Sequence, residues 1–235
     1  MTKDEVMSQL EAMGTEQTKK TFTRHGAKEP FFGVKVGDLK KLQKKIKKNH
    51  ALSLELWQTG NTDAMYLAGL IADETQISAD HLRGWVKDAY WSYLNEYTVP
   101  WVAADSGNAW ELGLEWIDAP DEQAQAAGWG TLSSMLSSAQ YDELDIPALE
   151  GLLDRVAKEI DGAENRTRYT MNGFVIAAGS FVEELTSKAM AVADAIGKVE
   201  VFMGDTACKV PLATQYIKKV ADMGRVGKRK KIARC

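Results

Sequence analysis

The chain has 235 residues, of which 45% are hydrophobic and 26% are charged, with two cysteines and a formal net charge of −4. A chain of this length forms one large domain or two small ones, and it buries enough surface to fold without disulfides or structural metals. Two cysteines do not make the disulfide framework of a secreted domain, and no apolar run approaches the ~20 residues of a membrane span. The first residues also lack a signal-peptide pattern. We therefore expect a cytoplasmic monomer with no membrane partner.

Positive charge is concentrated in two segments, although the whole chain is acidic. Residues 35–48 carry seven lysines against Asp38, and residues 218–235 carry eight basic residues against Asp222. The rest of the chain holds 14 basic and 31 acidic side chains, a net charge of −17. Basic patches on an acidic protein favour a polyanion bound at defined places, above all the phosphates of a nucleic acid. The alternative is a solvated helix face and a frayed basic tail.

The apolar pattern predicts one helix after another along the chain. The first clear stripe lies in the first basic segment and consists of Val36, Leu39, Leu42 and Ile46. Later helices are expected to begin at capping or first-turn residues, namely Asn61 or Thr62, Ser78, Asp121 and Pro147. Further helices fit residues 164–179, 182–196 and 212–223, whereas residues 31–32 and 199–202 are weak strand candidates. We therefore predict an all-α chain of stacked helical pairs, with an ordinary globular bundle as the alternative.

Familiar catalytic and cofactor motifs do not occur in the sequence. His25, His50 and His81 are isolated, and no cysteine or histidine lies at metal-ligand spacing. No glycine-rich loop has the spacing of a P-loop or a dinucleotide fingerprint, and no serine lies in a nucleophile elbow. We expect no metal and no cofactor, so catalysis would have to come from carboxylates, amides and aromatic rings on helices.

The most unusual stretch is aromatic and spans residues 85–101. Its rings are Trp85, Tyr90, Trp91, Tyr93, Tyr97 and Trp101. On a helix, Trp91 and Asn95 share a face because they are four residues apart. A ring beside an amide suits a nucleobase or a deoxyribose, by stacking and cation–π contact. The alternative is that these rings fill the core.

Three motifs resemble those of the AlkD-like DNA alkylation repair family. Residues 29–36, followed by the basic helix, resemble the opening motif of that family, and residues 89–100 resemble the entry to its central helix. Residues 224–235 are similar to the C-terminal tail of a divergent branch. The resemblance implies a right-handed α-α superhelix of HEAT-like, armadillo-type helical pairs, here a single domain over residues 1–223 followed by a basic tail over 224–235. It also implies a basic concave groove for duplex DNA and release of cationic N-alkylated purines such as 3-methyladenine and 7-methylguanine.

The resemblance also assigns site residues, with one substitution at the centre. Trp91 matches the first tryptophan of the family, Asn95 takes the place of its aspartate, and Phe174 takes the place of its second tryptophan. Gln125 takes the place of an arginine. Glu96 is a neighbouring carboxylate, but it lies ~100° round a helix from Asn95 and could serve only where the helix is rotated or locally unwound. We therefore assign Trp91, Asn95, Glu96 and Phe174 to the catalytic centre.

An asparagine has no charge to oppose a developing cation, and losing one such group typically costs ~10²–10³ in rate. We expect binding of duplex DNA, including alkylated DNA, to outweigh glycosylase activity. The expected DNA contacts are Lys35, Lys40, Lys41, Lys44, Lys47, Lys48, Gln125, Lys228, Arg229, Lys230 and Lys231. The alternative function is a non-catalytic helical-repeat module whose acidic body binds a basic protein.

Overall fold

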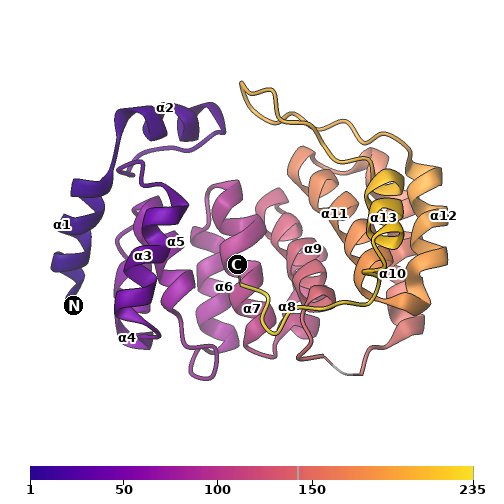
Figure 1. Cartoon of the computed structure of the whole chain (residues 1–235), viewed down its shortest axis with the longest axis horizontal. Coiled ribbons are helices and arrows are strands. Elements are labelled where there is room, and N and C mark those ends of the chain that lie inside the picture. Colours follow the sequence, from indigo (N-terminus) through magenta and orange to yellow (C-terminus); the bar gives the residue numbers. More distant parts are fainter. Residues whose placement is uncertain (142, 235) are drawn as a thin grey trace.

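The structure is a computed structural model that describes residues 1–141 and 143–234, and this part of the chain is built from helices (Figure 1). A groove layer contains α3 (Val36–Ile46), α5 (Thr62–Ile71), α7 (Val99–Asp105), α9 (Glu122–Ser137), α11 (Asn165–Phe181) and α13 (Ala213–Asp222). A back layer contains α4 (His50–Trp57), α6 (Ala79–Asp88), α8 (Ala109–Ile117), α10 (Ile146–Glu159) and α12 (Thr186–Ile196). Each helix of the groove layer contacts the next one, so the helical pairs stack side by side. Within the described residues there is no strand, and the weak strand candidates are irregular loops.

The helices begin where local chemistry favours a start. The side chains of Asn61, Ser78 and Asp121 each accept a backbone N–H in the first turn of α5, α6 and α9, and Pro147 lies in the first turn of α10. The three capping side chains accept backbone N–H groups that have no partner within the helix. Proline suits the first turn because it has no N–H to leave unpaired. The predicted helix starts are therefore confirmed.

Two large apolar cores run through the stack. The first joins α1 (Lys3–Met13) and the helices from α3 to α9, and the second joins the helices from α7 to α13, so the two meet at α7 to α9. A small third cluster consists of Phe22, Ala27, Phe31 and Trp91. None of the described helices combines the length and the apolar character that a membrane crossing requires.

Residues 224–234, which we call the strap, leave α13 and run back across the groove layer (Figure 1). The Gly227 amide donates to Ser180 at the end of α11, and the Lys230 amide donates to Ser137 at the end of α9. The Arg234 guanidinium reaches Asp105 at the end of α7 and the carbonyl of Ala72 after α5. The expected basic tail is thus an ordered segment along the C-terminal ends of four helices; Cys235 lies outside the described residues.

A second connection, which we call the arch, closes over the opposite ends of these helices. It consists of α2 (Glu16–Arg24) and the loop of residues 202–206. The Asp205 amide donates to the carbonyl of Arg24 at 2.9 Å. Gly204 has a φ of +76°, and a Cβ there would lie 2.2 Å from the same carbonyl oxygen. Only glycine permits so close an approach, so the contact depends on the sequence at this position.

Candidate nucleic-acid interface

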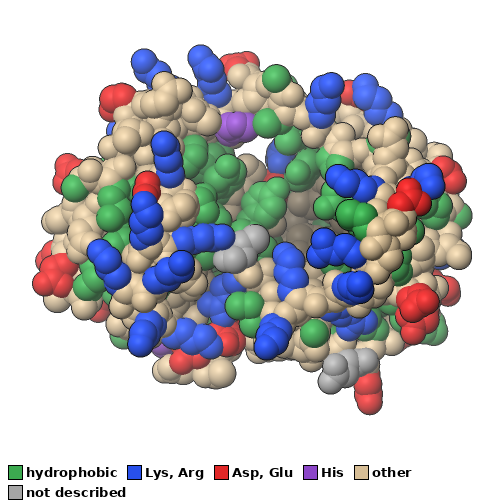
Figure 2. All heavy atoms as spheres, in the orientation of Figure 1, with side chains coloured by type: hydrophobic (Ala, Val, Ile, Leu, Met, Phe, Trp, Pro, Cys, Tyr) green, Lys and Arg blue, Asp and Glu red, His purple; other side chains and the backbone are tan. Residues whose placement is uncertain are grey.

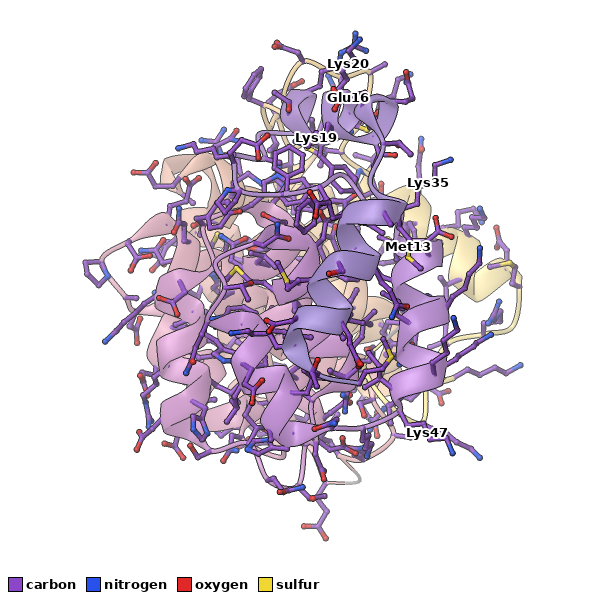
Figure 3. The ribbon with its side chains drawn as sticks, turned by 90° about the vertical axis from the view of Figure 1, so that its left-hand side faces the viewer. Met13, Glu16, Lys19, Lys20, Lys35 and Lys47 are labelled. Carbon is purple, nitrogen blue, oxygen red and sulfur yellow. The ribbon has the colours of Figure 1, made fainter. Side chains whose placement is uncertain are left out.

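The two basic segments lie on one face of the molecule. Figure 2 shows lysine and arginine side chains gathered over α3, the strap and α13, around a hollow in the middle of this face. Figure 3 shows Lys35 and Lys47 at the two ends of α3. Segments separated by about 170 residues in the sequence are thereby brought to one surface. We call this surface the basic face.

Most of the expected phosphate contacts are available on the basic face. The exposed side chains are those of Lys35, Lys41, Lys44, Lys47, Lys48, Lys228, Lys230 and Lys231, and Lys40 is partly exposed. Two of these lysines have acidic neighbours, because Lys41 pairs with Asp38 at 2.7 Å and Lys48 pairs with Glu74. The Lys41 pair is largely exposed, and such a pair is weak and can exchange for a phosphate. The Glu74 side chain is only 14% exposed and also pairs with Arg234, so Lys48 is held more firmly.

Arg229 makes hydrogen bonds within the protein. Its guanidinium donates to the carbonyl of Phe181 at 3.3 Å and to that of Tyr141 at 2.6 Å. These bonds hold the strap against α11 and the loop after α9. Arg229 is partly exposed, and two of its donors anchor the strap, so its contact with phosphate stays a prediction.

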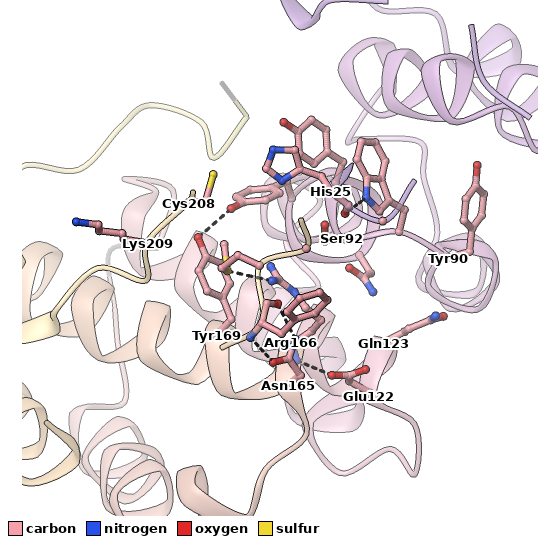
Figure 4. A pocket seen from close by; sticks show the side chains of 18 residues that line it. His25, Tyr90, Ser92, Glu122, Gln123, Asn165, Arg166, Tyr169, Cys208 and Lys209 are labelled. Atoms are coloured by element: carbon pink, nitrogen blue, oxygen red, sulfur yellow. Dashed lines mark hydrogen bonds between the residues drawn. The ribbon is translucent and has the colours of Figure 1, made fainter. Parts of the chain in front are cut away.

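A cavity of about 530 Å³ lies beneath the arch (Figure 4). Aromatic side chains line much of it, namely Tyr90, Trp91, Tyr93, Tyr97, Tyr169 and Phe202. Polar side chains of Asn95, Glu122 and Arg166 also reach its wall. Tyr97 and Tyr169, whose hydroxyls are 3.5 Å apart, also line a second hollow of about 290 Å³ that is bordered by Lys230 of the strap. The two rings therefore separate the arch cavity from the hollow on the basic face.

A π-helical turn, η1 (Leu94–Thr98), sets the directions of the central side chains. Pro100 has no N–H to donate to the carbonyl four residues earlier, and the Val99 amide instead bonds the carbonyl of Leu94, five residues back. The Thr98 hydroxyl donates to the carbonyl of Tyr93 at 2.9 Å. The local unwinding that the sequence reasoning required for Glu96 is therefore present.

The unwound turn places Glu96 in a buried ion pair and not in the arch cavity. The Arg166 guanidinium donates to both carboxylate oxygens, at 2.5 and 2.7 Å, and the Glu96 side chain is 1% exposed. Burial raises the pKa of Glu96, and the hydrogen bonds and charge of Arg166 offset part of that rise. Burial alone would lower the pKa of Arg166, but Glu96 raises it. The carboxylate is thus held by a cation and is not free to act as a base.

Asn95 lies in the wall of the arch cavity. Its side chain is buried, and its Oδ1 has no hydrogen-bond partner within the described part of the chain. A buried amide oxygen without a partner is rare in folded proteins and calls for an explanation. The acidic residue that lines the cavity among the described residues is Glu122, and its carboxylate accepts the Arg166 amide at 2.5 Å.

The other residues assigned from the sequence lie less favourably. Trp91 borders the cavity, but its indole donates to the carbonyl of His25 at 2.8 Å and its ring packs on Phe22. Phe174 is completely buried against Trp129 in the second core, so its assignment to the catalytic centre is wrong. Gln125 donates to Ala119 and accepts from Thr167. Both ends of its amide are engaged within the protein, and its contact with DNA stays a prediction.

Arg166, Tyr169 and Phe202 also line the arch cavity, and none of them was predicted from the sequence. They come from α11 and from the loop after α12, at least 65 residues beyond the aromatic stretch. No sequence spacing links residues so far apart, because they come together only in the folded structure. No group of three or more histidine, cysteine, aspartate or glutamate side chains in the described part of the chain is arranged to hold a metal ion.

Known proteins resemble the chain over almost its whole length. The sequence profile of the DNA alkylation repair enzyme family matches residues 6–207. Uncharacterized protein Lin0241 of Listeria innocua serovar 6a is 32% identical over 225 residues, which cover 93% of this chain and 97% of that protein. Uncharacterized protein Lmo0209 of Listeria monocytogenes serovar 1/2a is 33% identical over the same shares.

A solved structure extends the comparison to the fold. It is described as a new family of proteins related to the HEAT-like repeat DNA glycosylases with affinity for branched DNA structures. It has a TM-score of 0.91 and 35% identity, and the match covers all of both chains. The prediction of an all-α, right-handed HEAT-like superhelix is thereby confirmed, as is the resemblance stated from the motifs.

Proposed function

Because the chain belongs to the family of DNA alkylation repair enzymes, we propose that it binds DNA on its basic face, prefers branched DNA, and has little glycosylase activity. The observation that carries the proposal is the meeting of two basic segments, from opposite ends of the chain, on one face. The remainder of the molecule is strongly acidic and repels a polyanion elsewhere. The basic face therefore attracts the duplex arms of the bound DNA.

The preference for branched DNA rests on the solved structure with the same fold, whose family has affinity for such DNA. The arch supports the same preference for this chain. It covers one end of the groove layer, so a long straight duplex has less free surface than a DNA whose arms diverge. A junction can place one arm along the lysines of α3 and another along the strap and α13.

Weak catalysis follows from the chemistry of the arch cavity. Asn95 carries no charge where the family places an aspartate, Glu96 is neutralised by Arg166, and Glu122 accepts the first-turn amide of α11. No carboxylate among the described cavity residues is left to stabilise an oxocarbenium-like sugar. Such a loss typically lowers the rate by ~10²–10³.

The binding proposal is tested by removing Lys40, Lys44 and Lys47 together, each replaced by alanine. Removal of each lysine that meets a phosphate should reduce the slope of log K against log salt by about 0.9, for duplex and four-way junction alike. Binding isotherms at several salt concentrations between about 50 and 200 mM measure that slope. The matched control replaces Lys87 and Lys158, exposed lysines of α6 and α10 in the back layer, and should leave the slope unchanged.

An unchanged slope in the α3 variant would contradict DNA binding through these lysines. Absence of DNA binding by the unaltered protein at low salt would favour the protein-interaction function instead.

The catalytic part is tested by Asn95→Asp on methylated duplex DNA. We expect release of free methylated base by the natural protein to stay near the spontaneous rate, and Asn95→Asp to increase it because a carboxylate can oppose the developing positive charge. Chromatography of the released bases measures both rates. Ser92→Asp, which adds an acid elsewhere in the cavity wall, is the control. Fast release by the natural protein, or equal release by both variants, would contradict the assignment.

A further inference from the structure

Phe202 is a large apolar side chain held in an exposed position at the edge of the arch cavity. The residue is 70% exposed, the largest exposed fraction among the exposed large hydrophobic residues of the described chain. The side chain of Asn165 fixes its backbone on both sides, because Oδ1 accepts the Phe202 amide at 2.7 Å and Nδ2 donates to its carbonyl at 3.0 Å. The loop thus presents the ring to solvent from a fixed backbone.

The cavity next to Phe202 has room for a nucleotide but not for a duplex. Its volume of about 530 Å³ lies in the ≈300–1,000 Å³ range of sites for small organic molecules. A base pair enclosed by two phosphate backbones cannot enter a hollow of this size beneath the arch. The occupant that fits is one unpaired nucleotide.

The wall of the cavity has the chemistry of a single-strand nucleic-acid site. The rings of Tyr93, Tyr97 and Tyr169 are partly exposed in the cavity wall, and Tyr93 is held in place by stacking on the buried Trp91, with ring centroids 4.3 Å apart. Aromatic faces bind any base by stacking. The exposed Lys209 at the rim can meet a phosphate.

Asn95 supplies an observation that is independent of the rings. Its Oδ1 is buried in the wall and has no partner in the described residues, so the amide retains an unused acceptor. The exocyclic amine or ring N–H of a base would satisfy it after a rotation of the amide, a torsion with a broad energy minimum.

We infer that the arch cavity holds an unpaired nucleotide at a DNA branch and that Phe202 stacks on the last base pair beside it. This inference rests on the DNA binding proposed above and names the feature of branched DNA that is recognised. Apolar side chains that insert between base steps are a common device of DNA-binding proteins. A fully paired duplex offers neither an unpaired base for the cavity nor an exposed terminal pair for the ring.

The experiment uses a three-way junction with 2-aminopurine as an unpaired base at the branch, and a fully paired duplex of the same length. Affinity for both is measured together with the fluorescence of 2-aminopurine, which stacking quenches. Phe202→Ala should lower the preference for the junction by roughly tenfold and reduce the quenching, with duplex affinity unchanged. Phe202→Trp should restore both. Met223→Ala removes an exposed apolar side chain at the end of α13, away from the cavity, and should change neither.

The outcomes separate this inference from the function on which it rests. Equal junction preference and equal quenching in the natural protein and in Phe202→Ala would overturn the inference while salt-dependent DNA binding stands. No fluorescence change when the natural protein binds the junction would overturn it as well. Failure of the natural protein to bind either DNA at low salt would instead overturn the proposed function.

Discussion

At the scale of single residues, buried carboxylates join segments that are distant in the sequence. Asp63 at the start of α5 accepts the backbone amides of Phe32, Gly33 and Val34 at 2.6 to 3.0 Å. Burial raises the pKa of Asp63, and these three hydrogen bonds act against that rise. They fix the loop that leads directly into the basic helix α3. Within this loop, Gly33 has a structural reason: its φ is +79°, and a Cβ there would lie 2.7 Å from the backbone nitrogen of Lys19.

Removing the cation from the Glu96 pair tests how much that contact stabilises the fold. Arg166→Met leaves Glu96 buried without a partner, and we expect a loss of about 3–5 kcal/mol in the free energy of unfolding at neutral pH. Urea denaturation measures it. The matched control is Arg155→Met, since Arg155 pairs with the exposed Asp118 and Glu159, and it should cost less than about 1 kcal/mol.

The same variant has a predicted pH dependence. Without Arg166, the pKa of Glu96 in the folded state rises further above its unfolded value, so the folded state binds the proton more tightly. The stability from that proton is complete below the unfolded pKa and is lost as pH rises through the folded one. The difference in the free energy of unfolding between Arg166→Met and the natural protein should therefore be small near pH ~4 and increase toward pH ~7. A difference that stays constant over this pH range would contradict the view that the lost stability comes from the unpaired Glu96.

At the scale of the elements, the unwound turn η1 needs a close approach by α5. A Cβ on Gly69 would lie 2.3 Å from the Cγ2 methyl of Thr98, which is much closer than van der Waals contact. The turn thus packs where α5 has no side chain. This approach brings the aromatic stretch against the groove layer and keeps Asn95 and Glu96 on different sides of the wall.

Gly69→Ala should destabilise the protein by about 1–3 kcal/mol because the added methyl overpacks the contact with Thr98. Thr98→Ser removes the clashing methyl and keeps the hydroxyl, so the double variant should recover part of the loss. Thermal or urea unfolding of the natural protein, the two single variants and the double variant gives the double-mutant cycle. Gly151→Ala on the exposed face of α10, where nothing lies within 4 Å, should instead be neutral or stabilising by up to about 1 kcal/mol. Additive effects of Gly69→Ala and Thr98→Ser would contradict the clash.

Helix starts were predictable from the sequence because caps act within four residues, as at Asn61, Ser78 and Asp121. The all-α class and the basic helix followed from periodicity in the same way. Phe174 was assigned by its place opposite the family's second tryptophan, and a matched position does not show whether the ring faces the cavity or the core, where it packs against Trp129. The ion pair of Glu96 was not predictable because its partner Arg166 is 70 residues away and because the π turn before Pro100 changes the helical phase. The local signals were thus readable, whereas the site depends on tertiary neighbours.

At the scale of the whole molecule, the strap connects parts that a helical solenoid otherwise leaves independent. In such stacks each repeat mainly contacts its neighbours. Arg234 bypasses that rule, since its buried guanidinium bonds Asp105 at 2.6 Å, Glu74 at 2.5 Å and the carbonyl of Ala72 at 2.8 Å. Its positive charge also lies at the C-terminal ends of α5 and α7, where the helix dipoles are negative. The C-terminus therefore fastens the N-terminal half of the stack.

Arg234→Met should loosen the N-terminal half selectively. Asp105, whose side chain is fully buried, would keep its charge without a cation, and we expect a cost of about 3–5 kcal/mol. Because the Arg234 guanidinium bonds the ends of α5 and α7, amide hydrogen exchange should accelerate there first, while amides of α12 should exchange as before. Lys231→Ala, an exposed strap residue, is the control and should leave both stability and exchange unchanged. Uniform acceleration over all helices would mean that the strap only adds global stability, whereas acceleration confined to α5 and α7 would identify it as a fastener between the two halves.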